Sequence, residues 1–166
     1  MAERDEINDR EIVMINKKEL LDFLLRARVK TYAGAGGEVN PRFEGSKQLE
    51  FAEEKWFYRD IFYVGNGIFF GMDVVHFDSK PVWGTSYYGN FKGMTEDETD
   101  KILRKALVAL WDKTRLWETV QWDERGYSYV CKGNGSLEEL EGREEISKHN
   151  KVIFAFNYRG GMIAEE

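Results

Sequence analysis

The strongest constraint on this chain is an internal repeat, because parts of its second half repeat the first at an offset of 71 residues. In one short window four identical pairs share this offset: Gly71/Gly142, Lys80/Lys151, Tyr87/Tyr158 and Gly89/Gly160. Average composition gives roughly one or two such pairs by chance. A repeated unit builds two similar surfaces, so the repeat predicts a ligand cleft at the seam between the halves. The turn 65–67 matches 133–135 at an offset of 68, which predicts three extra residues in the second copy.

Two helices are predicted from capping residues followed by apolar residues at helical spacing. Asn16 and Glu19 form a capping-box pattern ahead of leucines spaced three and four residues apart, which predicts a helix over 17–30. Thr95 and Glu98 repeat the pattern ahead of a second apolar face, which predicts a helix that ends near residue 112.

The remaining segments are predicted to be strands joined by hairpins. Residues 47–90 are rich in aromatic and β-branched residues and are interrupted by turn sequences at 65–67 and 78–80, which predicts four antiparallel strands. The second copy predicts four more, near 117–123, 126–132, 138–148 and 151–159, with turns at 134–135 and 149–151.

The expected fold is therefore α+β, a duplicated unit of one helix and four antiparallel strands, with the two helices packed on antiparallel sheet. We expect a single domain over 16–163, made of repeats 16–91 and 95–162, after a disordered or loosely ordered N-terminus over 1–15. The strand near 56–64 is apolar or aromatic on both faces. Its second face either lines a cavity or belongs to a thick sandwich-like core without one.

Composition narrows the class of protein and its partners. The chain has 166 residues, 42% of them hydrophobic, and no apolar run of about 18 residues that would span a bilayer, so a soluble protein without a membrane partner is expected. The net charge of −6 gives no basic field for nucleic acid, so no direct nucleic-acid partner is expected. A charged N-terminal segment and the single Cys131 favour the cytoplasm.

Few residues are candidates for catalysis or cofactor binding. His76 and His149 are isolated, with no spacing typical of a metal site, so no metal or cofactor is expected. The glycine-rich run 33–38 follows the first helix instead of preceding one, which predicts a turn and not a phosphate loop.

The strongest polar pattern lies on the first two strands of the first repeat. Glu50 and Asp60 fall on neighbouring strands, so the two carboxylates could approach each other, raise one pKa and permit acid/base chemistry. The alternative is an ion pair with Arg59 or Lys47, or exposure to solvent. Aromatic residues nearby could stack on a ligand. The candidate ligand-binding residues are Glu50, Tyr58, Asp60, Trp83, Tyr87 and Tyr88.

Four spaced motifs resemble an uncharacterised family of prokaryotic domains that occur alone or behind an Xre-type helix-turn-helix segment. The motifs lie in the segments 32–38, 45–51, 57–60 and 81–89, which read YAGAGGE, GSKQLEF, FYRD and PVWGTSYYG. The resemblance covers about residues 20–163 and implies the sensor half of a regulator, but it supplies no activity and no site residues. Residues 1–15 are too short to contain the DNA-binding segment.

Together these observations favour a non-enzymatic small-molecule-binding domain, sensor-like, with a cleft between its repeats. The ligand is expected to be small and partly aromatic or cationic. One alternative is a small acid/base enzyme that uses Glu50 or Asp60, and another is a protein-interaction or dimerisation module, so a monomer or a homodimer is expected. Gln121 replaces Glu50 in the second copy and the run Tyr58-Arg59-Asp60 is lost there, so a single site weighted toward the first repeat is expected.

Overall fold

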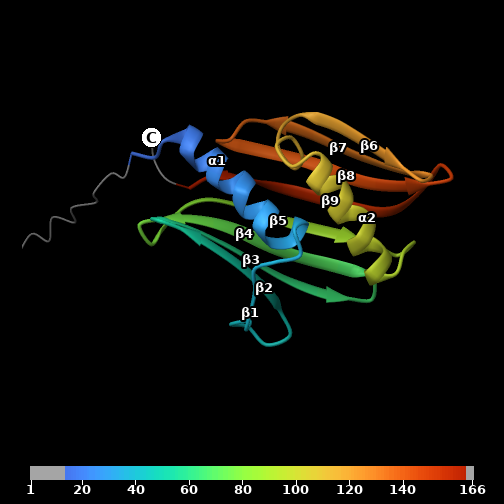
Figure 1. Ribbon diagram of the computed structural model, residues 1–166, viewed down its shortest axis with the longest axis horizontal. Helices are drawn as coiled ribbons and strands as arrows, with labels where there is room; N and C mark the ends of the chain where they lie inside the picture. Colours follow the sequence, from blue (N-terminus) through green and yellow to red (C-terminus); the bar gives the residue numbers. More distant parts are fainter. Residues whose placement is uncertain (1–13, 164–166) are drawn as a thin grey trace, which may run out of the picture.

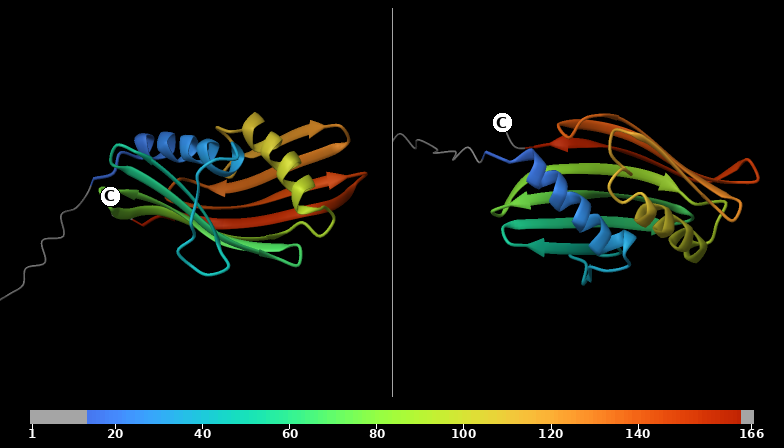
Figure 2. Two further views of the ribbon diagram at one scale, coloured as in Figure 1. Left: turned by 60° about the horizontal axis from the view of Figure 1, so that its bottom comes forward. Right: turned by 45° about the horizontal axis from the view of Figure 1, so that its top comes forward.

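One antiparallel sheet of nine strands curves around two helices in the computed structural model of the protein, which describes residues 14–163 (Figures 1 and 2). This confirms an α+β fold with two helices on an antiparallel sheet. None of the helices in this part of the chain is long and apolar enough to cross a membrane. The loosely ordered N-terminus predicted for 1–15 lies outside the described residues, except for its last two.

The first helix, α1 (Lys17–Arg28), begins where predicted because the Asn16 side chain caps it. The Asn16 carbonyl oxygen Oδ1 accepts hydrogen bonds from the backbone N–H groups of Lys18 and Glu19 at 3.0 and 3.2 Å. The helix ends two residues before the predicted limit and continues as a π-helical turn, η1 (Val29–Ala33). Thr31 departs from helical geometry there, with φ −107° and ψ −115°.

The second helix, α2 (Glu96–Ala109), begins after Thr95, whose hydroxyl accepts a hydrogen bond from the backbone N–H of Glu98 at 3.1 Å. Three acidic residues occupy its first turn, where they complement the helix dipole. Its buried face, which includes Leu103 and Leu107, packs toward the sheet. Both helices therefore turn an apolar face to the concave side of the sheet (Figure 2).

The strands form two meanders. The first contains β2 (Lys47–Glu53), β3 (Trp56–Gly65), β4 (Ile68–Phe77) and β5 (Lys80–Asn90). The second contains β6 (Thr119–Glu124), β7 (Tyr127–Gly135), β8 (Glu139–Lys148) and β9 (Lys151–Met162). A two-residue strand, β1 (Glu38–Val39), pairs with β2 at one edge and was not predicted, because two residues carry no alternation pattern.

The two meanders join edge to edge, not face to face. Strand β5 pairs with β9 in antiparallel orientation, with Tyr87 directly opposite Tyr158, so the strand order is β1-β2-β3-β4-β5-β9-β8-β7-β6. The sandwich-like core considered from the sequence is therefore wrong, since there is one sheet. Its concave face holds the core beneath the helices.

The boundaries of the eight long strands follow the 71-residue offset to within one residue. The ten-residue strands β4 and β8 begin at Ile68 and Glu139, and their register shifts fall at Val75/His76 and Ile146/Ser147, also 71 residues apart. The predicted three-residue insertion is wrong. Residues 133–135 are the end of β7 and not a turn, because the β7–β8 turn lies at 136–138.

Candidate functional site

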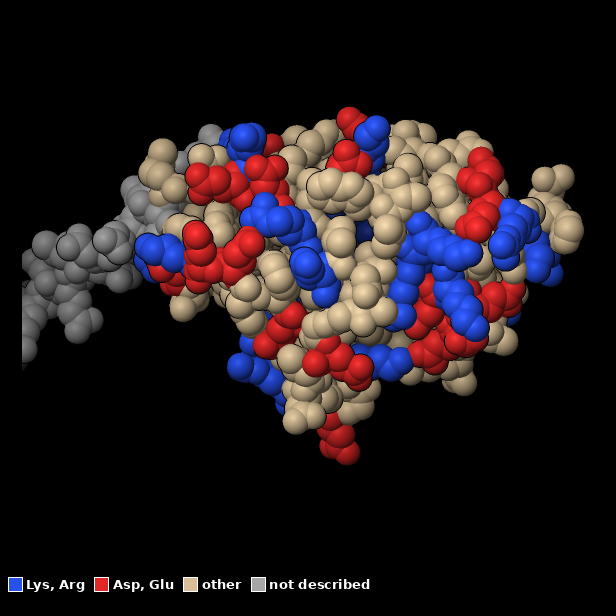
Figure 3. Space-filling model, viewed as in Figure 1, with Lys and Arg blue, Asp and Glu red and all other residues tan. Residues whose placement is uncertain are grey.

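A cavity of about 390 Å³ lies between the concave face of the sheet, η1 and α2. Figure 3 shows the side of the molecule that carries the helices, where the surface is hollowed between them and acidic and basic side chains are intermixed over α2. Polar side chains of β3, β4 and β5 form the floor: Tyr58, Asp60, Asp73 and Tyr87. Apolar side chains form much of the wall: Phe62, Phe69, Phe91, Leu103, Leu107 and Phe154.

Strand alternation explains why the polar groups converge. Tyr58 and Asp60 are two residues apart on β3 and therefore point to the same face. Asp60 lies directly opposite Asp73 on β4, and Asp73 lies opposite Thr85 on β5. Both aspartates are buried, with 8% and 5% of their surface exposed. The floor thus contains two neighbouring buried carboxyl groups.

Hydroxyl groups and one arginine surround these carboxyl groups. The Tyr87 hydroxyl donates to Asp60 Oδ1 at 2.5 Å, and the Tyr58 hydroxyl donates to Asp73 Oδ2 at 3.2 Å. The Thr85 hydroxyl donates to the other oxygen of Asp73. Arg28 Nη2 lies 3.6 Å from Asp73 Oδ2 and forms its ion pair. Asp73 is therefore satisfied by three partners, whereas Asp60 has a single hydroxyl donor among the described residues.

The protonation of Asp60 is strongly perturbed. Burial, followed by repulsion from the Asp73 charge, raises the pKa of Asp60 to about 7, against the opposing effect of the Tyr87 hydrogen bond. Burial and the charge of Asp60 also raise the pKa of Tyr87 well above its usual range. Near neutral pH the floor therefore exchanges one proton on a buried carboxyl group. Such perturbed groups in a cavity are typical of functional sites.

Apart from the exposed Glu38, which has no ion pair within 4.0 Å among the described residues, the other charged side chains around the cavity are paired. Three ion pairs join them: Arg115–Glu144 at 2.8 Å, Arg104–Asp100 at 3.3 Å and Lys47–Glu96 at 2.6 Å. The first is bidentate, since Nε and Nη2 of Arg115 each donate to one oxygen of Glu144, and it joins a partly buried guanidinium to a fully buried carboxylate. The last is exposed and connects β2 to α2 at the rim. In residues 14–163, Asp60 has no basic partner within 4.0 Å.

The structure separates the six predicted site residues. Tyr58, Asp60 and Tyr87 line the cavity. Glu50 does not, because it lies opposite Arg59 while Asp60 lies opposite Leu49, so the two carboxylates point to opposite faces of the sheet. The predicted approach of Glu50 to Asp60 is therefore wrong. Arg59 Nε donates to Glu50 at 2.8 Å, which is the ion pair considered as the alternative.

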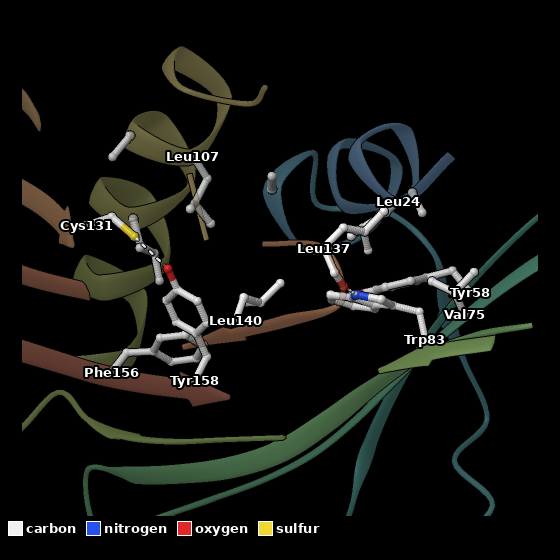
Figure 4. Packing of buried hydrophobic residues seen from close by; sticks show 14 of the residues in the cluster. Leu24, Tyr58, Val75, Trp83, Leu107, Cys131, Leu137, Leu140, Phe156 and Tyr158 are labelled. Atoms are coloured by element: carbon white, nitrogen blue, oxygen red, sulfur yellow. Dashed lines mark hydrogen bonds between the residues drawn. The ribbon is translucent and has the colours of Figure 1, made fainter. Parts of the chain in front are cut away.

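Trp83 and Tyr88 also lie outside this cavity. Trp83 is fully buried in the core, where its Nε1–H donates to the backbone carbonyl of Leu137 at 3.0 Å (Figure 4). Tyr88 is 55% exposed on the opposite face of the sheet, next in sequence to the inward-facing Tyr87. The sequence pattern placed both near a ligand because aromatic strand residues look alike whether they face a core, a cavity or solvent.

Most residues that line the cavity were not predicted from the sequence, and the charged residues Arg28, Asp73 and Arg115 are among them. Asp73 carried a signal, since it is an isolated acidic residue in an apolar strand and matches Glu144 at the repeat offset. Arg28 lies in the last turn of α1, where a basic residue is expected for the helix dipole alone, and Arg115 lies in an irregular segment whose course the sequence does not predict.

Comparison with known proteins identifies a family but no activity. A family model described as a domain of unknown function (DUF5680) matches residues 60–163, which extend from Asp60 to the end of β9. No curated protein and no solved structure matches the chain. Within residues 14–163, no group of three or more His, Cys, Asp or Glu side chains is arranged to hold a metal ion.

Proposed function

The chain belongs to the DUF5680 family, whose function is unknown, and from its cavity we propose that it is a non-enzymatic small-molecule-binding domain of the sensor type. The main support for this proposal is the cavity of about 390 Å³, which combines apolar walls with a few buried polar groups. Small-molecule sites have this size and composition, in which the polar groups orient the ligand. Tyr58, Asp60 and Tyr87 supply those groups here.

The acid/base enzyme considered from the sequence receives less support. It required Glu50 and Asp60 to converge, and they lie on two faces of the sheet. The residues that line the cavity also include no His, Cys or Ser that would serve as a nucleophile or its base. A raised pKa at Asp60 alone fits ligand recognition as well as it fits proton transfer.

An interaction module is the second candidate because apolar side chains are exposed on the outer face of the sheet. Phe70, Met72 and Tyr88 are 51%, 51% and 55% exposed. Exposed apolar patches mark contact surfaces in many proteins. Sedimentation over a concentration series tests this candidate: self-association that Tyr88→Lys abolishes supports it, and a monomer at every concentration contradicts dimerisation.

We also propose that residues 16–91 and 95–162 are copies of one unit, with the seam at β5 and β9. Pairs of hydrogen-bonded side chains support this, since they recur at the repeat offset. Tyr58–Asp73 corresponds to Tyr129–Glu144, and Asp60–Tyr87 corresponds to Cys131–Tyr158. The tyrosine of the run 58–60 is therefore retained as Tyr129, contrary to the sequence interpretation. Superposition of 47–90 on 118–161 tests the proposal, which requires the paired Cα atoms to coincide.

A sensor role agrees with the resemblance to prokaryotic domains that follow Xre-type helix-turn-helix segments. In such an arrangement a ligand-binding domain controls the DNA-binding segment attached to it.

The test is a thermal-shift screen of a metabolite library, with a variant in which the cavity is filled. Leu103 faces the cavity from α2 and is 3% exposed, so Leu103→Trp occupies part of the ligand volume. Val108→Trp is the matched control, because Val108 lies on the same helix and is 48% exposed. We expect compounds that stabilise the wild type and the control but not Leu103→Trp. Stabilisation of all three proteins alike contradicts binding in the cavity, and so does a screen without any stabilising compound.

A further inference from the structure

We propose that the cavity selects an organic cation, a protonated amine or amidinium on an apolar body, and that its charged head binds the Asp60 carboxylate. This inference rests on the proposed function and names the class of ligand. It follows from the pairing of charges around the cavity, the position of Asp60 beside a second carboxyl group, and the aromatic side chains above it.

The first step is the charge that remains after pairing. Each arginine that lines the cavity has a carboxylate partner, because Arg28 pairs with Asp73, Arg104 with Asp100 and Arg115 with Glu144. Lys47 at the rim pairs with Glu96. Asp60 is the buried acidic group of the cavity that lacks a cation within 4.0 Å in the described part of the chain. Among its buried groups the cavity thus has a deficit of one positive charge whenever Asp60 is ionised, and the exposed Glu38, which also lines the cavity, adds no positive charge.

The second step is the free-energy cost of ionising Asp60 inside the protein. A buried carboxylate without a cation is strongly disfavoured, and a second carboxyl group directly across the strand pair adds repulsion. An ammonium group in contact with Asp60 would offset both the cost of burying its charge and the repulsion from Asp73. An anionic ligand would add a third negative charge to this floor, and a neutral ligand would leave the deficit in place.

The third step is the shape and polarity of the space above Asp60. Phe62 and Phe69 line the cavity, together with the ring of Tyr87, whose hydroxyl binds Asp60. Aromatic faces attract cations and also pack against the apolar body of a ligand. The site therefore offers one carboxylate at the floor and an aromatic and apolar wall, which matches an amine on an apolar body and not a highly polar metabolite.

Binding of a cation is coupled to release of a proton. Five ionisable groups interact with Asp60: Tyr58 from β3, Asp73 from β4, Tyr87 from β5, Arg28 from α1 and Arg115 from the segment after α2. Lys47 from β2 lines the same cavity and pairs with Glu96. The protonated carboxyl group loses its proton to solvent as the cation arrives, and the carboxylate then pairs with it. Affinity for a cation is therefore expected to rise with pH until Asp60 is fully ionised, near and above its pKa of about 7.

The experiment compares three probes that share one ring: benzylamine, benzyl alcohol and benzoate. We expect calorimetry near pH 8 to show benzylamine binding at least about tenfold more tightly than the other two. Below pH 7 its affinity should fall about tenfold per pH unit, because benzylamine remains protonated while Asp60 becomes neutral. Titration in two buffers of different ionisation enthalpy should show up to about one proton released per benzylamine bound below pH 7.

Asp60→Asn is the decisive variant, and its shape and hydrogen-bonding capacity match those of a neutral Asp60. We expect it to bind benzylamine no more tightly than benzyl alcohol, with no proton release, while its affinity for benzyl alcohol is unchanged. Asp112→Asn, an exposed site outside the cavity, should behave as the wild type.

Three results would overturn the inference. These are equal affinity for benzylamine and benzyl alcohol, a preference for benzylamine that survives in Asp60→Asn, and no binding of benzylamine. If one of these results occurs but benzyl alcohol or benzoate still binds, and Leu103→Trp removes that binding, the preference for a cation is refuted while the proposed function stays intact. A cavity that binds nothing in the metabolite screen contradicts both.

Discussion

The burial of Asp60 has a consequence for folding stability that can be measured without any ligand. Asp60 is 8% exposed, lies opposite Asp73 and has a pKa raised to about 7. A carboxyl group whose pKa is higher in the folded state than in the unfolded state favours folding at low pH, and that stability is lost as the pH rises through the folded-state pKa. Asp60→Asn removes this titration, so the variant should keep its stability at alkaline pH.

The magnitude follows from the two pKa values. Each pKa unit of difference corresponds to about 1.4 kcal/mol, and the pKa of Asp60 rises from 3.8 to about 7. Between about pH 5 and about pH 8 the wild type should therefore lose about 2.5 kcal/mol of unfolding free energy through this group. Because groups distant from Asp60 titrate alike in both proteins, the difference between wild type and Asp60→Asn reports Asp60 together with its coupling to the neighbouring Asp73. This value is an upper limit, because any water that enters the cavity would solvate the carboxylate and lower its pKa.

Urea denaturation followed by tryptophan fluorescence at several pH values measures this difference. We expect the unfolding free energy of Asp60→Asn relative to the wild type to rise by about 1 to 2.5 kcal/mol between about pH 5 and about pH 8. The exposed control Asp112→Asn should show a difference that does not vary with pH. Parallel curves for Asp60→Asn and the wild type would refute the perturbed protonation of Asp60, and a relative loss of stability at high pH would show that the carboxylate is favoured by its surroundings.

Two further substitutions test the packing around the sheet. Glu144→Gln leaves the partly buried Arg115 guanidinium without its carboxylate, so the unfolding free energy should fall by about 3 kcal/mol in urea denaturation. A loss below about 1 kcal/mol would contradict the pairing. Gly142→Ala places a methyl group against the Tyr158 hydroxyl and should cost about 1 to 3 kcal/mol, measured as a lower thermal midpoint. Gly65→Ala, where the added methyl group meets nothing within 4 Å, is its control and should change stability by less than about 0.5 kcal/mol.

The sequence predicts the elements of this fold well because their signals are local. Asn16 and Thr95 identify the starts of both helices through their capping side chains. Turn residues and β-branched or aromatic runs identify the eight long strands to within a few residues. The end of α1 was not predicted because Thr31 departs from helical geometry shortly after it. The Thr31 hydroxyl donates a hydrogen bond to the backbone carbonyl of Ala27, and the sequence pattern does not predict this change of backbone direction.

The assembly of the strands and half of the site residues were not predictable in this way. From the sequence alone, Glu50 on β2 and Asp60 on β3 could lie on the same face of the sheet. The register of β2 on β3 instead sets Glu50 opposite Arg59, so its side chain lies on the face opposite to that of Asp60. A shift of one residue would have reversed the outcome, and register depends on long-range packing. Similarly, Trp83 and Tyr87 are both aromatic strand residues, and only the position of the helices decides that one fills the core and the other lines the cavity.

The cavity floor explains why a single site is expected from two similar halves. In the first half Asp60 faces the cavity and receives the Tyr87 hydroxyl, whereas in the second half Cys131 stands at the matching offset and contacts the Tyr158 hydroxyl at 3.4 Å. Burial raises the pKa of the Cys131 thiol, so this group stays neutral and needs no counter-ion. The buried acidic group without a cation therefore exists in the first half alone among the described residues. A cationic ligand is therefore expected to bind in the first half, next to Asp60. Substitution of Asp60 alone should remove the preference for a cation over a neutral ligand.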